Sequence, residues 1–268
     1  METTLTIWGV RGAFPVADRR FLDYGGNTSC IALRRGDRML CLDAGSGFVG
    51  LCGHMEGVRR LDILIGHVHM DHVMGLFSLS AGPCPEVHLY GEARQGLSFE
   101  EQVRRLTDKP YWPVDIGDMG ERIQIHQIEE GAAWDLPWGN ETIHISTLRG
   151  YHPNMSTLYQ LAWGKRRVAY IVDCEMSPAM EASIADFARG CSLLIWDANY
   201  VREDKHVGWG HSTWEEGLAV AQAAGVEQIL MTHYSTYFAD EFVREQEALA
   251  RARCSFCEFA REGMVIAL

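Results

Sequence analysis

Short stretches rich in aliphatic residues alternate with polar turns along most of the chain, and this pattern predicts β-strands. Several stretches carry apolar residues at every second position, as expected for a strand with one buried face. The predicted strands cover residues 4–10, 30–36, 38–45, 62–69, 86–92, 141–149, 158–164, 167–174, 192–200, 227–234 and 263–268.

Helical signals are clearest in the last third of the chain. Residues 177–190 begin with a capping serine followed by proline and end in glycine, which predicts a helix. In residues 212–225, a Ser or Thr is followed three positions later by Glu, a capping box, and the segment stops at glycine. Residues 240–252 predict a third helix, and residues 98–130 an inserted loop with a short helix. The pattern as a whole predicts one α/β domain over residues 1–268, with much antiparallel sheet.

Composition and charge narrow the class of protein. The chain has 268 residues, 47% of them hydrophobic, which is enough for a substantial core. Its formal net charge is −12 and its Lys and Arg residues are scattered, which argues against binding a long nucleic acid. No apolar run is long enough to cross a membrane, and no signal peptide is visible. The eight cysteines show no disulfide pattern, so we expect a cytoplasmic protein. Cys254 and Cys257 have CxxC spacing but no second pair, which favours a structural role over metal binding.

The strongest chemical signal is the stretch ILIGHVHMDHVMG, residues 63–75. A hydrophobic strand runs directly into His67, His69, Asp71 and His72, and histidine and aspartate are poor residues for filling a strand end. Because side chains alternate along a strand, His67 and His69 are predicted to point the same way and to grip one cation. Asp71 and His72 follow a turn and can reach a second cation.

Three more candidate ligands lie at the ends of predicted strands or just after them. Taken singly, His152 could be a loop histidine, Asp173 a helix cap and His233 a strand-end residue. Their shared position, at the carboxyl ends of strands where the sites of α/β proteins collect, favours a common function.

At these residues the sequence resembles the metallo-β-lactamase superfamily of metal-dependent hydrolases, over nearly its whole length. The segments WGVRGAFPV, YGGNTSC, LDAGSG and DANY are similar to its phosphodiesterase-like branch. The GHST element at residues 210–213 is shared with tRNA 3′-processing nucleases and indicates phosphodiester chemistry.

The resemblance implies the four-layer αββα sandwich and two divalent metal ions, zinc first, with manganese or iron as alternatives. By this resemblance, one ion would be held by His67, His69 and His152. The other would be held by Asp71, His72 and His233, and Asp173 would bridge the two ions. Asp43 would orient a ligand histidine from outside the metal shell.

The same resemblance implies catalytic roles for Asp71, which would also be a metal ligand, and for His211. A water shared by the two ions would attack phosphorus, and Asp71 would orient it or take its proton. His211 would donate a proton or hydrogen bond to the phosphate or the leaving oxygen. Asp197 is the candidate partner that orients His211, although it could equally be a turn residue.

The sequence departs from the family pattern at two places. Pro153 and Asn154 follow His152 where a small, glycine-type residue is expected, and Cys174 replaces a usual threonine after Asp173. We expect Cys174 to be buried, since neighbouring strand residues face opposite ways. Several aromatic residues flank the predicted site in sequence, either as core or as platforms for a nucleobase: Tyr111, Trp112, Tyr151, Tyr200 and Trp209.

The expected substrate is a small phosphodiester such as a cyclic nucleotide, because no long basic insertion is present to hold a tRNA. An RNA 3′-end endonuclease is the alternative, followed by a superfamily hydrolase of another ester, such as a thioester or lactone. A metal-stabilised binding or sensing protein is the non-enzymatic alternative. A homodimer is expected from the resemblance alone.

Overall fold

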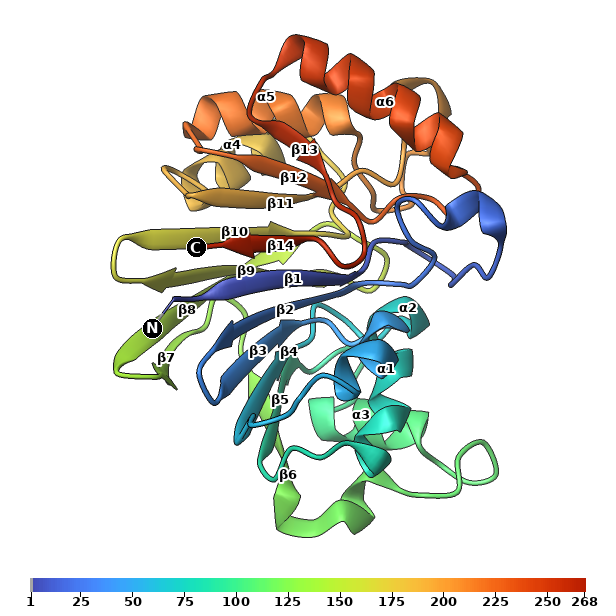
Figure 1. Ribbon diagram of the computed structural model, residues 1–268, viewed down its shortest axis with the longest axis vertical. Helices are drawn as coiled ribbons and strands as arrows, with labels where there is room; N and C mark the ends of the chain where they lie inside the picture. The colour runs from blue at the N-terminus through green and yellow to red at the C-terminus, as the bar shows by residue number, and fades with distance from the viewer. Residues whose placement is uncertain (1) are drawn as a thin grey trace.

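The structure is a computed structural model that describes residues 2–268. Its strands form two sheets that pack face to face, with α1 (Gly47–Cys52), α2 (Met70–Val73) and α3 (Phe99–Leu106) outside the first (Figure 1). Helices α4 (Pro178–Phe187), α5 (Trp214–Ala224) and α6 (Asp240–Arg253) lie outside the second. The predicted αββα sandwich is therefore confirmed.

Each sheet has seven strands and mixes parallel with antiparallel pairs. The spatial order of the first is β14 (Val265–Ala267), β1 (Thr4–Gly9), β2 (Cys30–Arg35), β3 (Arg38–Leu42), β4 (Arg60–Leu64), β5 (Val87–Glu92) and β6 (Ile123–Ile128). The order of the second is β13 (Cys257–Phe259), β12 (Ile229–Thr232), β11 (Leu193–Asp197), β10 (Arg166–Ile171), β9 (Ser156–Trp163), β8 (Glu141–Gly150) and β7 (Ala133–Trp138).

Side-chain alternation divides the interior into two cores. In β3, Leu40 and Leu42 pack into the core shared by the two sheets, whereas Cys41 between them packs toward α1. This is the two-residue period of a strand that is buried on both faces. Cys254 and Cys257 lie in the larger core, as expected from their apolar surroundings.

The helices begin where their caps predict. Ser177 accepts a hydrogen bond from the Met180 amide and precedes Pro178 at the start of α4. At α5, Thr213 and Glu216 form the capping box, and Gly225 ends the helix with a φ of 65°. No helix within residues 2–268 is long and apolar enough to cross a membrane.

Within residues 98–130, the predicted short helix is confirmed, but the prediction of a loop for the remainder was wrong. This segment contains α3 but also the 3-10 helix η3 (Ile116–Arg122) and strand β6. Strand β6 is an edge strand with glutamines at two of its positions, so its polar content resembles that of a loop. Strand β7 was missed because it contains Pro137, which only an edge strand tolerates well, and β13 because it has only three residues.

Candidate metal centre

The seven residues predicted as ligands come together at one edge of the sandwich, just beyond the carboxyl ends of strands from both sheets. His67, His69, Asp71 and His72 follow β4 of the first sheet. His152, Asp173 and His233 follow β8, β10 and β12 of the second sheet.

His67 and His69 share a direction for a different reason from the one predicted. Strand β4 ends at Leu64, before either histidine, and His69 is the N-cap residue of α2. The loop and the start of that short helix, rather than strand alternation, bring the two ring centroids to 4.2 Å.

One group of potential ligands consists of His67, His69 and His152, whose ligand atoms lie within 4.8 Å of one another. His152 faces His69 through its Nε2 atom, 3.1 Å from His69 Nδ1. Its other ring nitrogen, Nδ1, lies 3.0 Å from the carbonyl oxygen of Gly210, which fixes the ring.

The second group consists of Asp71, His72 and His233. Asp173 lies beside it: its Oδ2 is 2.8 Å from Nε2 of His72, and its Oδ1 is 3.2 Å from Nε2 of His233. Asp173 also forms a group with His67 and His72, so one carboxylate can serve both sets of ligands.

Side chains around the centre contact the Nδ1 atoms of His72 and His233, which point away from the other ligands. Asp43 Oδ2 lies 2.7 Å from His72 Nδ1, and the same oxygen accepts a hydrogen bond from the Tyr170 hydroxyl. Ser29 Oγ lies 2.8 Å from His233 Nδ1. These contacts leave the Nε2 atoms of both imidazoles directed at the shared space, which is how outer groups orient metal ligands.

Unsatisfied buried atoms show that the side chains fit a divalent cation. Within residues 2–268, both ring nitrogens of His67 are buried without a hydrogen-bond partner, and Nε2 of His72 and Nε2 of His233 lie against the carboxylates of Asp71 and Asp173. Leaving such atoms unpaired in the interior costs about 1–3 kcal/mol each. Imidazole nitrogens and carboxylate oxygens are also the ligands that zinc, manganese and iron accept.

The pKa of His72 is shifted in the opposite direction from the pKa values of His67, His69 and His152. Burial lowers the pKa of His67, His69 and His152, which favours the neutral ring that can bind a cation. Burial also acts to lower the pKa of His72, but the carboxylates of Asp71, Asp43 and Asp173 outweigh it and raise that pKa. Binding a cation at His72 would therefore release a proton.

His211 lies next to these groups, before the start of α5. Its Nδ1 is 3.0 Å from Asp197 Oδ2 and 3.3 Å from Asp173 Oδ1. Burial acts to lower the pKa of His211, but the Asp197 carboxylate outweighs it and raises the pKa to about 9. Asp197 also accepts a hydrogen bond from the Asn199 amide, so it both contacts His211 and stabilises its own turn.

Sequence reasoning missed a backbone segment that covers the second group. The amide of Ala13 donates to Asp71 Oδ2 over 2.7 Å, with Ala13 at a φ of 63°. A Cβ atom on Gly12 would lie 2.6 Å from His233 Nε2, so only glycine fits there. Gly12 and Ala13 belong to the segment WGVRGAFPV, which resembles the family, but the sequence analysis predicted no contact between this segment and the metal ligands.

The two departures from the family pattern have local explanations. Asn154 adopts a φ of 66°, and asparagine tolerates this left-handed conformation better than most residues other than glycine. Cys174 is fully buried, and its Sγ accepts a hydrogen bond from the Tyr151 amide. Both residues shape the backbone around the centre.

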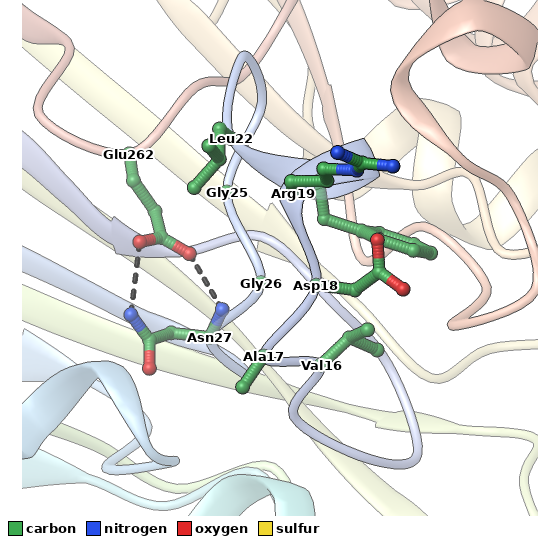
Figure 2. Close-up of a pocket in the computed structure, with 10 residues that line it drawn as sticks. Val16, Ala17, Asp18, Arg19, Leu22, Gly25, Gly26, Asn27 and Glu262 are labelled. Carbon is green, nitrogen blue, oxygen red and sulfur yellow. Dashed lines mark hydrogen bonds between the residues drawn. The ribbon is translucent and has the colours of Figure 1, made fainter.

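Two cavities border the centre. One of about 330 Å³ includes His211 in its lining, and one of about 150 Å³ includes His67 and His69. A larger cavity, about 580 Å³, is lined by residues 16–27 and by Glu262, and by none of the predicted ligands. Figure 2 shows Glu262 there, accepting hydrogen bonds from the backbone and side chain of Asn27.

Comparisons with known proteins identify the family of the chain. The chain is similar to the probable metallo-hydrolase YhfI of Bacillus subtilis, with 23% identity over 90% of this chain and 91% of that protein. It is 25% identical to a Ribonuclease Z of Methanopyrus kandleri, over 99% of this chain and 98% of that protein. The crystal structure of YhfI aligns with a TM-score of 0.74 and 21% identity, over 100% of this chain and 99% of that one. The family described as the beta-lactamase superfamily domain matches residues 38–234, and the chain therefore belongs to the beta-lactamase superfamily.

Proposed function

We propose that the centre binds two divalent cations, zinc first with manganese or iron as alternatives, and hydrolyses a small phosphodiester such as a cyclic nucleotide. The observation that carries this proposal is the convergence of buried imidazole nitrogens and carboxylate oxygens beside His211, with both ring nitrogens of His67 left unpartnered. The proposed ligands are His67, His69 and His152 for one ion, Asp71, His72 and His233 for the other, and Asp173 for both.

The proposed chemistry needs a nucleophile and charge neutralisation at phosphorus. Two bound ions would supply a water of lowered pKa and positive charge beside the phosphate oxygens. Asp71 lies at the edge of the second group, where its carboxylate can orient that water or accept its proton. The Ala13 amide fixes one of its oxygens through the 2.7 Å hydrogen bond.

His211 is the proposed proton donor. Its Nδ1 is engaged with Asp197, so Nε2 is the ring nitrogen left to face a substrate. The raised pKa keeps the ring protonated at neutral pH, the state needed to donate to a phosphate or leaving oxygen. The His211 ring borders the cavity of about 330 Å³, which can hold part of a substrate.

Charge favours a small substrate over RNA. Among the residues that line the two bordering cavities, Arg94 is the one lysine or arginine, and Glu92 pairs with it at 2.9 Å. Binding a long polyanion requires several unpaired basic groups. The second candidate is an RNA 3′-end endonuclease, favoured by the similarity to a Ribonuclease Z over 99% of this chain.

The decisive experiment measures release of nitrophenolate from bis-p-nitrophenyl phosphate by protein loaded with zinc, manganese, iron or cobalt. We expect turnover by the wild-type protein and a loss of about 100-fold or more in His69→Ala, since even groups that only orient ligands contribute about 10- to 100-fold. The matched control is His144→Ala, because His144 is an exposed histidine on β8, paired with Asp135.

Two results would contradict the proposal in different ways. Protein that binds the metals but turns over no ester with any of them is the metal-stabilised binding or sensing protein instead. Protein that binds no metal, measured by elemental analysis after dialysis, removes the basis of the proposed centre.

A further inference from the structure

Three segments that are distant in sequence line the cavity of about 330 Å³ beside His211. They lie before η1 (Arg19–Phe21), between β11 and α5, and after β12. The lining residues are mostly aromatic or small and polar: Ala13, Phe14, Asn199, Tyr200, His206, Trp209, His211, Ser235, Thr236 and Tyr237.

Aromatic rings form a continuous series from the rim of this cavity to the proposed proton donor. The ring centroids of Trp209 and His206 are 5.4 Å apart, those of His206 and Tyr200 5.6 Å, and those of Tyr200 and His211 5.5 Å. These separations are typical of interacting aromatic pairs. Of the aromatic residues that flank the site in sequence, only Tyr200 and Trp209 belong to this lining.

Three large apolar side chains at this cavity are exposed. Trp209 is 64% exposed, Phe14 65% and Tyr237 88%. Single exposed apolar residues are common on protein surfaces and need no explanation. Three that converge on one cavity beside a reactive centre are typical of a ligand-binding site.

The charge of the lining restricts the ligand. None of the ten lining residues is lysine, arginine, aspartate or glutamate. Ser235, Thr236 and His206 add hydroxyl and imidazole groups that can form hydrogen bonds. An uncharged, planar group with an apolar face and a polar edge fits this lining, and a nucleobase has that chemistry.

The loop that carries Trp209 is held in place by one carboxylate. Glu175 accepts hydrogen bonds from the amides of Gly208 and Gly210, over 2.7 and 3.0 Å. Both glycines have positive φ, 86° and 82°, and the carbonyl of Gly210 also contacts His152. Trp209 therefore sits between two anchored residues, which lowers the entropic cost of stacking a ligand on it.

We propose that this cavity binds the nucleobase of a nucleotide, so that the substrate is a nucleoside phosphodiester with its phosphate at the metal centre. This inference rests on the proposed phosphodiesterase function and names its substrate class. The cavity of about 330 Å³ falls within the range of about 300–1,000 Å³ typical of ligand pockets, whereas the cavity of about 150 Å³ lined by His67 and His69 is too small.

Calorimetric titration of the metal-loaded protein with AMP and with ribose 5-phosphate tests the inference, because the two ligands share the phosphate and differ by the base. We expect the wild type to bind AMP at least about 10-fold more tightly, since stacking on an aromatic residue gives about 5- to 150-fold per base. Trp209→Ala is expected to remove most of this preference and Trp209→Phe to keep most of it. Val207→Ala is the control, because Val207 is an exposed neighbour outside the lining.

Equal affinities of the wild type for the two ligands, or an equal loss for both in Trp209→Ala, would overturn the nucleobase site. Hydrolysis of bis-p-nitrophenyl phosphate by the same preparations reports separately on the proposed function. Hydrolysis with equal affinities removes the nucleobase site alone. A preference for AMP without hydrolysis supports the site and removes the proposed function.

Discussion

Three residues at the centre hold a backbone conformation that is rare outside glycine. Asp43, Asp173 and His233 have φ values of 59°, 58° and 61°, and each follows shortly after the end of a strand. Such conformations cost about 1–3 kcal/mol each and persist where the surrounding structure enforces them. Here the left-handed turn directs a side chain away from the strand axis and toward the centre.

Asp43 provides the sharpest test at the residue scale. We expect Asp43→Asn to weaken metal binding by about 10- to 100-fold, because the variant loses the charge that orients and polarises His72. Asparagine also tolerates the left-handed conformation, so the turn should survive. The measurement is a competition titration of bound zinc against a chromogenic chelator.

Tyr170→Phe is the control for this substitution. It removes one hydrogen bond to the same carboxylate oxygen but leaves the carboxylate and its contact with His72. We expect a smaller loss of metal affinity than in Asp43→Asn. Wild-type affinity in Asp43→Asn would show that Asp43 only supports the fold.

His211 lies just before the N-terminus of helix α5, and this helix positions it. The helix begins with the capping box of Thr213, two residues after His211, and the Thr213 carbonyl accepts a hydrogen bond from the Trp196 indole of β11. Gly217, on the same face of the helix, lets the indole pack directly against the helix backbone. A Cβ atom there would lie 2.6 Å from the Trp196 ring.

Gly217→Ala therefore tests packing at the scale of the element. Alanine favours helices over glycine, but the clash with Trp196 should dominate and destabilise the protein by about 1–3 kcal/mol. In α1, the Cβ of Gly50→Ala would meet Trp8 at an ordinary 3.5 Å, so this control should be neutral or stabilise by about 0.5–1 kcal/mol. Urea unfolding followed by circular dichroism measures both, and equal effects would contradict the packing argument.

The centre belongs to the whole molecule because each sheet supplies only part of it. The loop after β4 and the short helix α2 that follows it bring four of the proposed ligands from the first sheet. The second sheet brings His152, Asp173 and His233, and the two sets meet only when the sheets pack face to face. The chain as a whole carries a formal net charge of −12, so positive charge near a substrate would come mainly from bound cations.

Substrate choice follows from that charge. We expect the metal-loaded protein to hydrolyse cyclic AMP and to cleave a tRNA precursor poorly when both are assayed side by side. Cleavage of tRNA should also fall steeply as salt is raised from 50 to about 200 mM, since each phosphate contact releases counterions. Efficient cleavage of the tRNA alone would replace the proposed function with the RNA 3′-end endonuclease.

The resemblance to the family implied the αββα sandwich, the full set of metal ligands and the role of His211. The sequence by itself determined an α/β domain, most strands, the three longer helices and the histidine-rich motif at residues 67–72. These follow from local signals: alternation along strands, caps such as Ser177 and Thr213, and a motif of histidines and an aspartate, which are common metal ligands. It could not show β6 or β13, because an edge strand with polar residues and a strand of three residues resemble loops.

Only the tertiary structure decided which residues complete the site. Ala13, Ser29 and Glu175 act through a backbone amide, a hydroxyl and a carboxylate whose partners lie far away in the sequence. The contact between His211 and Asp197 likewise depends on how α5 packs on β11, and the aromatic cavity on three loops meeting. Local composition carries no information about such pairings, because they exist only when the two sheets and their loops are packed together.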